Sequence, residues 1–221
     1  MKRIRWYMEI IPRLLRSILL SSYVSNSQTV LPIRVSNARS KVIIRKGANS
    51  KFVLNGILRI DPYFGGTEPV FITLAPESTL IIDGDMLMGN GTQIMLDRGA
   101  YLYIGGKRKE SASGITERTR IMVRHNAHIG TDCIIAWGGY ITDCDWHSIE
   151  GQREQADVYI GDHVWIASNV TILKGVSIGA NCIVASNSLV SKGTVPASSL
   201  IGGVPAQILK NNVSWRRDLI A

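Results

Sequence analysis

The chain has 221 residues, 45% of them apolar, which is enough for one globular domain with a continuous core. Lysine and arginine outnumber aspartate and glutamate by 25 to 17, and the formal net charge of +8 favours an anionic partner. Outside the N-terminus the basic residues are scattered, without zinc-finger spacing or an aromatic RNA-binding motif, so no nucleic-acid partner is expected. Three cysteines without a CxxC pair indicate neither a disulfide framework nor a zinc ribbon, and they favour a cytoplasmic location.

Residues 1–24 are predicted to form an amphipathic helix, which Pro12 is expected to kink. Arginines interrupt the apolar residues, so no stretch is long enough for a signal-peptide core or a membrane span. Two interpretations remain open. The helix packs on the open end of the domain that follows, or it makes peripheral contact with the inner membrane surface through residues 1–20. The apolar residues at helical spacing are Ile4, Met8, Ile11, Leu15 and Ile18.

A loose repeat runs through residues 30–105. Three segments that begin at Ile44, Leu74 and Leu96 can be laid over one another, and alternating apolar residues follow each of them. We expect irregular early coils here, with insertions looping out near 61–68 and 105–120. An ordinary β-sandwich is the alternative for this part.

A strict repeat follows, in which an aliphatic residue returns every six positions. The period fits neither a helix nor a simple strand alternation, so each hexapeptide must be a short strand plus a corner, and three of them make one triangular coil. This predicts an all-β fold, a parallel β-helix over residues 25–200, with Cys182 at a small inward position. The repeating aliphatic residues are Val123, Ile129, Ile135 and Ile141 in one block, and Ile160, Ile166, Ile172, Ile178, Val184 and Val190 in another.

The repeat breaks between the two blocks. The period from Ile141 would place position 147 inside the core, but a histidine stands there and the next ten residues, 148–157, are mostly polar. We expect the chain to leave the coil here in an excursion with His147 at its base. Residues 201–221 follow the last repeat and are expected to form a C-terminal tail, as a loop or helix.

Three stretches resemble the hexapeptide-repeat acyltransferases, in particular a sugar and polysaccharide O-acetyltransferase branch similar to the galactoside, maltose and xenobiotic acetyltransferases. The first is Val158 to Gly179, with Ile160-Gly161-Asp-His-Val-Trp165-Ile166 inside it, and the second is Ile201-Gly202-Gly203-Val204-Pro205-Ala206-Gln207-Ile208. The third, Ile141-Thr-Asp143-Cys-Asp145-Trp-His147, resembles the segment in which this family keeps its catalytic histidine. Together they cover about residues 121–210.

The resemblance implies a fold and an activity. It implies left-handed winding, against the general preference for right-handed crossovers, and a homotrimer with active sites in clefts between neighbouring subunits. It further implies an acetyl-CoA-dependent O-acetyltransferase that acts by direct transfer, without a metal, on a hydroxyl of a sugar or polysaccharide such as capsule or lipopolysaccharide.

His147 is the candidate general base, because an acceptor hydroxyl needs a neutral imidazole to take its proton as it attacks the thioester. Asp143 and Asp145 are candidates to orient the imidazole or to bind the acceptor, and both would serve equally well as corner residues. Cys144 beside them offers a covalent alternative, which direct transfer makes unnecessary.

The donor site is carried over by position from the resemblance. Lysines suit the phosphates of acetyl-CoA, and small residues let its pantetheine arm run close to the backbone. Two departures stand out: Ala167 and Ala185 replace a frequent glycine, and Gln207 replaces a frequent basic residue. The implied donor residues are Trp165, Ala167, Ser168, Ala185, Ser186, Lys192, Gly203, Pro205 and Lys210.

Three other functions are compatible with parts of the sequence. N-acetylation of an amino sugar or nucleotide sugar fits the same motifs. A γ-carbonic-anhydrase-like zinc enzyme needs three histidines, for which His125, His128 and His163 are candidates beside His147. A non-enzymatic trimeric scaffold that binds a glycan is the third.

Overall fold

The computed structural model describes residues 2–37, 40–62, 66–107 and 113–217. Within them a single long helix, α1 (Lys2–Ser21), precedes three parallel sheets that share one core. Sheet A contains β1 (Asn26–Ser27), β4 (Lys51–Leu54), β7 (Thr79–Asp83), β10 (Tyr101–Gly105), β13 (Asn126–Ile129), β16 (Val158–Ile160), β19 (Val176–Ile178) and β22 (Gly193–Val195). Sheet B contains β2 (Ile33–Val35), β5 (Leu58–Asp61), β8 (Met86–Gly89), β11 (Ser113–Ile115), β14 (Ile134–Ile135), β17 (Trp165–Ile166), β20 (Ile183–Val184), β23 (Ser199–Gly203) and β24 (Ala206–Asn211). Sheet C contains β3 (Val42–Lys46), β6 (Val70–Leu74), β9 (Gln93–Leu96), β12 (Arg120–Val123), β15 (Tyr140–Thr142), β18 (Thr171–Ile172) and β21 (Leu189–Val190).

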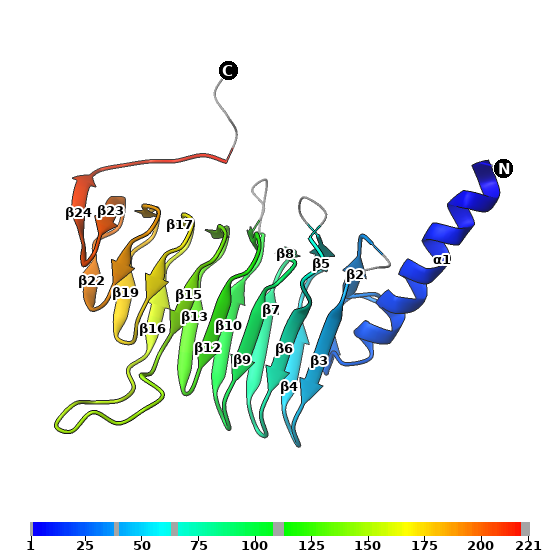
Figure 1. Ribbon diagram of the computed structural model, residues 1–221, viewed down its shortest axis with the longest axis horizontal. Helices are drawn as coiled ribbons and strands as arrows, with labels where there is room; N and C mark the ends of the chain where they lie inside the picture. Colours follow the sequence, from blue (N-terminus) through cyan, green and yellow to red (C-terminus); the bar gives the residue numbers. More distant parts are fainter. Residues whose placement is uncertain (1, 38–39, 63–65, 108–112, 218–221) are drawn as a thin grey trace.

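The sheets are the three sides of a solenoid. The chain visits them in the order A, B, C, and each strand from β1 to β20 pairs in parallel with the strand three places later. Figure 1 shows the resulting coils stacked along the long axis of the molecule, with α1 at one end. The predicted all-β fold, a left-handed parallel β-helix, is confirmed. The β-sandwich alternative for residues 30–105 is wrong, because the strands in this range pair in parallel with the strands of the next coil.

The six-residue period forms the core. Ile160 pairs with Ile178, Ile166 with Val184 and Ile172 with Val190, so each aliphatic side chain stacks on its counterpart one coil later, and all six are buried. The period shortens by one residue at the end, where Val195 pairs with Ile178. Thr194, four places after Val190, is consequently exposed.

Close coil stacking constrains the corners. At the A–B corner a Cβ on Gly161 would lie 2.7 Å from the backbone nitrogen of Ala180 in the next coil, so glycine is required there. At the B–C corner Asn169 and Asn187 adopt the left-handed conformation, which asparagine tolerates. Their side chains also form a hydrogen bond between successive coils, in which Asn169 Nδ2 donates to Asn187 Oδ1 over 3.2 Å.

The early coils differ in detail from the sequence-based expectation. Leu74 does pair with Leu96, but Ile44 pairs with Ile72, so the overlay of the Ile44 segment is two residues out of register. Within the loop expected near 105–120, residues 113–115 form β11, which pairs in sheet B, while β10 ends at Gly105 and β12 begins at Arg120. Residues 108–112 of that loop, and 63–65 of the loop expected near 61–68, lie outside the described residues.

The two ends of the solenoid are finished differently. Ser17 and Ser21 of α1 accept hydrogen bonds from the backbone of Val35 and Ile33 in β2, both at 3.1 Å, and Leu20 is buried against the core. At the other end β23 and β24 form an antiparallel hairpin, where a loop or helix was expected in residues 201–221. Among the described residues no helix has the length and apolarity needed to cross a bilayer.

Candidate functional site

The expected excursion is present and has a hydrogen-bonded stem. It spans residues 143–157 between β15 and β16, and it leaves the C–A corner at the lower edge of Figure 1. Cys144 and Gln155 form an antiparallel bridge, Asp145 N donates to Glu154 O over 2.9 Å, and Ala156 N donates to Asp143 O over 3.0 Å. The stem therefore holds a projecting loop at a defined place on the solenoid.

His147 lies just beyond this stem. Its side chain is exposed, and the ring makes no hydrogen bond to any other described residue. The preceding residue, Trp146, has a φ of +63°, which turns the backbone sharply at this point, and its indole nitrogen donates to Thr142 Oγ1 over 3.1 Å. The imidazole is consequently available to a ligand or a partner subunit.

Asp143 is fully buried and serves the preceding coil. Its carboxylate accepts hydrogen bonds from three successive backbone N–H groups, those of Arg124, His125 and Asn126, at 2.7 to 2.9 Å. Asp143 therefore acts as a corner residue, which is one of the two alternatives that the sequence left open, and its carboxylate points into the coil.

Asp145 forms an ion pair with Lys174 at the same corner of the next coil. Both side chains are about three-quarters buried, at 27% and 22% exposure, so solvent screens this pair less than a surface pair. The pair ties the start of the excursion to the corner between β18 and β19. The lysine was not among the predicted site residues.

A histidine–aspartate pair stands at the base of the excursion. His125 Nδ1 lies 2.9 Å from Asp157 Oδ1, and the same carboxylate accepts hydrogen bonds from Asn126 and Gln155, both at 2.9 Å. Burial of Asp157 would raise its pKa, but the three side-chain hydrogen bonds outweigh burial and lower the pKa below its ordinary value. The pair was missed because 32 residues separate its members, and only the pairing of Ala127 with Val158 brings them together.

Five of the nine implied donor residues gather at the B–C corner. Ala167 N donates to Val184 O, Ala185 N donates to Ile201 O, and Asn187 N donates to Ser168 O, so three successive coils are in register here. Gly203 N donates to Ser188 Oγ over 3.2 Å at the same corner. The side chains along this column are small: Ser186 and Gly203 are exposed, Ser168 and Ala185 are half-buried, and Ala167 is buried.

The remaining four donor residues lie elsewhere. Trp165 is on the outer face of sheet B, and Lys210 is in β24 opposite Leu200. Lys192 and Pro205 line a hollow of about 460 Å³ at the hairpin end. Lys192 belongs to the C–A corner, the same corner as the excursion.

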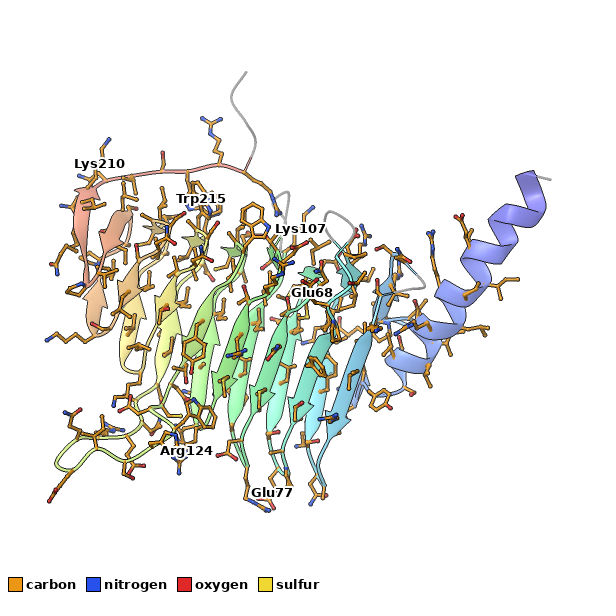
Figure 2. The ribbon with its side chains drawn as sticks, in the orientation of Figure 1. Glu68, Glu77, Lys107, Arg124, Lys210 and Trp215 are labelled. Atoms are coloured by element: carbon orange, nitrogen blue, oxygen red, sulfur yellow. The ribbon has the colours of Figure 1, made fainter. Side chains whose placement is uncertain are left out.

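The C-terminal tail folds back along the upper edge of the solenoid, opposite Arg124 and the excursion (Figure 2). The Trp215 ring stacks on His163 with centroids 4.1 Å apart, and its indole nitrogen donates to His163 O over 3.0 Å. Trp165 lies 6.0 Å from the same ring. No pattern in the sequence predicted that Trp215 would stack on His163 beside Trp165, one of the implied donor residues.

The thiols and the other histidines have structural surroundings. Burial raises the pKa of the Cys144 thiol, and it raises the pKa of the Cys133 thiol to about 12. Neither thiol is therefore ionised at neutral pH. His128 stacks between Tyr103 and Tyr159, at 4.8 Å from each ring. With His125 and His163 paired as described, the candidate zinc ligands are not gathered in one place, and no metal-ligating group of three occurs among the described residues.

Glu117 is a further buried acid that the sequence did not single out. It lies at the B–C corner with 6% exposure, and its Oε1 has no hydrogen-bond partner in the described residues. Burial raises its pKa, the charge of Arg118 partly offsets this, and the charge of Glu68 adds to it. Folding therefore makes the charged carboxylate of Glu117 less favourable than it is in the unfolded chain.

Fold and repeat together define a hexapeptide-repeat β-helix protein. Residues 157–192 match the family model described as "Bacterial transferase hexapeptide (six repeats)", which confirms the resemblance for the most regular part of the chain.

The named relatives are acetyltransferases. A polysialic acid O-acetyltransferase of Escherichia coli O1:K1 / APEC is 29% identical over 62% of this chain and 42% of its own length. One of Neisseria meningitidis is 42% identical over 41% of this chain and 45% of its own length. The chain thus spans about half the length of these curated relatives. The crystal structure of a polysialic-acid-specific acetyltransferase is 26% identical, with 86% of this chain and 91% of that chain covered and a TM-score of 0.48.

Proposed function

We propose that the protein is an acetyl-CoA-dependent O-acetyltransferase that modifies a hydroxyl of a sugar or polysaccharide, with His147 as the general base. The observation that carries the proposal is an exposed imidazole, without a hydrogen-bond partner among the described residues, held just beyond a hydrogen-bonded stem at a break in a transferase-type repeat. The names of the similar proteins support a glycan acceptor, such as a capsule, lipopolysaccharide or related polymer.

In this mechanism the acceptor hydroxyl donates its proton to the neutral His147 imidazole as its oxygen attacks the thioester carbonyl of acetyl-CoA. Backbone N–H groups near the cleft stabilise the oxyanion of the tetrahedral intermediate. Its collapse releases the acetylated glycan and free CoA, to which the imidazolium returns the proton.

The same proposal includes a homotrimer. His147 lies at the C–A corner whereas five donor residues lie at the B–C corner, so one chain carries the two parts on different edges of its solenoid. A neighbouring subunit that packs against one edge brings the parts together in a cleft.

A thiol-release assay with acetyl-CoA tests the function. The acceptors are polysialic acid, a neutral polysaccharide, a free amino sugar and a nucleotide-linked amino sugar. We expect CoA release with a polysaccharide, and we expect mild alkali to release acetate from the recovered product, because alkali cleaves an O-acetyl ester. Transfer only to the amino sugars, with an alkali-stable product, would identify an N-acetyltransferase and contradict the proposal, as would absence of transfer to the whole panel.

A further inference from the structure

α1 has two faces of different character. Ser17, Leu20 and Ser21 face the body of the protein, where they contact the first strand of sheet B. The opposite face is apolar and exposed, and Leu15 and Leu19 are 62% and 64% accessible to solvent. The large exposed apolar residues of the helix are Ile11, Leu14, Leu15, Ile18 and Leu19.

This apolar face continues onto the chain after the helix. Leu14 and Ile18 form one side of a groove of about 490 Å³, and Val30 and Leu31 form the other. Val30 is completely exposed. A contiguous apolar surface of this kind on a soluble domain marks an interaction site.

The same helix is strongly cationic. The sequence of α1 contains Lys2, Arg3, Arg5, Arg13 and Arg16 but Glu9 as its only acid. Figure 1 shows its N-terminal half projecting beyond the first coils, away from the excursion. An apolar face combined with basic residues on a helix too polar to cross a bilayer is the pattern of helices that lie in the plane of a membrane interface.

We propose that α1 docks the protein on the surface of an anionic lipid bilayer, with Ile11, Leu14, Leu15, Ile18 and Leu19 inserted at the boundary between headgroups and acyl chains. Anionic lipid headgroups attract the basic residues close to the surface, and salt weakens this attraction. A second copy of the same helix brings the same positive charge, so charge favours lipid over self-association. The proposal concerns where the protein acts, and it is independent of the acetyl transfer proposed above.

Vesicle flotation of the full chain tests this. The probes are vesicles of phosphatidylcholine alone and of an equal mixture of phosphatidylcholine and phosphatidylglycerol, at low and high salt. We expect the chain to float with the anionic vesicles at low salt, and to bind neutral vesicles weakly. The double variant Leu15→Gln, Leu19→Gln should reduce partitioning by about tenfold or more, because it removes two apolar side chains from the inserted face.

Met95→Gln is the matched control, since Met95 is also an exposed apolar residue, 38% accessible, but lies on sheet C far from α1. It should float like the parent. Melting temperature and oligomer mass report whether each variant is folded. Equal flotation of the double variant and the parent would overturn the proposal, as would failure of the parent to bind anionic vesicles. A drop in oligomer mass of the folded double variant, without vesicle binding by the parent, would assign the face to a second copy instead.

Discussion

At the scale of single residues, His147 carries the chemistry of the proposed transfer. His147→Ala should lower turnover by about 10²- to 10⁴-fold, the usual contribution of a positioned general base. The ring is exposed and makes no hydrogen bond within the described residues, so melting temperature and oligomer mass should not change. Steady-state thiol release and calorimetry measure the two effects, and parental turnover in a folded variant would contradict the assignment.

Cys144 tests the covalent alternative. The thiol is buried with a raised pKa, so it is neither ionised nor accessible at neutral pH. Cys144→Ala should therefore keep most of the activity. An inactive but stable variant, or an acetylated Cys144 detected by mass spectrometry during turnover, would show that the transfer is covalent.

Glu117 gives a stability effect with a defined dependence on pH. Its pKa is raised, so between the ordinary pKa of glutamate, near 4.3, and this raised pKa the folded chain holds a proton that the unfolded chain releases, and stability falls as pH rises through this window. Glu117→Gln removes this penalty. It should raise the melting temperature near pH 7.5 and leave it nearly unchanged near pH 4, and the opposite trend in thermal unfolding would show that the carboxylate is charged and stabilised.

At the scale of elements, α1 and β2 depend on two hydroxyl groups. Ser17→Ala and Ser21→Ala each leave a strand N–H without its partner, at Val35 and Ile33 respectively, which should cost about 1 to 3 kcal/mol of unfolding free energy. Ser22→Ala is the control, because the Ser22 side chain is exposed and its hydroxyl donates to Leu19 O in the last turn of α1 rather than to β2. Denaturant unfolding measures all three, and equal effects would mean that α1 does not hold the edge of β2.

The elements also show what the sequence could predict. The hexapeptide period predicted the β-helix and its core, because an inward aliphatic residue every six positions leaves few other folds. The excursion followed from the missing aliphatic residue at His147. The strand register of the early coils could not be predicted as well. The overlay placed Gly47 at the corner, but Asn49, two residues later, adopts the left-handed conformation there, and both residue types tolerate that conformation.

The site could be predicted only in part, for a physical reason. The donor residues were implied by the family resemblance, and the structure shows that five of them lie in one column at the B–C corner. Contacts between distant segments follow from no local pattern, as in the pairing of His125 with Asp157, of Asp145 with Lys174 and of Trp215 with His163. The catalytic and donor roles themselves stay predictions.

At the scale of the whole molecule, the separation of the two corners predicts complementation between inactive chains. His147→Ala removes the base from one edge, and Ala185→Trp blocks the donor column on another. In mixed trimers of the two variants, about one cleft in three combines an intact histidine with an intact column, so activity should return. Thiol release by refolded mixtures measures this, with each variant refolded alone as the control. No recovery in mixtures shown by mass to contain mixed trimers would place both parts of the site in one subunit.

The regular stacking of coils also fixes the distance along the solenoid axis between α1 and His147. The excursion leaves after β15, the fifth strand of sheet C counted from the end where α1 lies. Four steps between neighbouring strands, at about 4.8 Å each, set the histidine about 19 Å along the axis from the first coil. If α1 fixes that first coil to a lipid surface, the number of intervening coils sets how far a lipid-tethered glycan must reach. Sugars nearest the lipid would stay out of range, and acetylation would begin only at a minimum chain length.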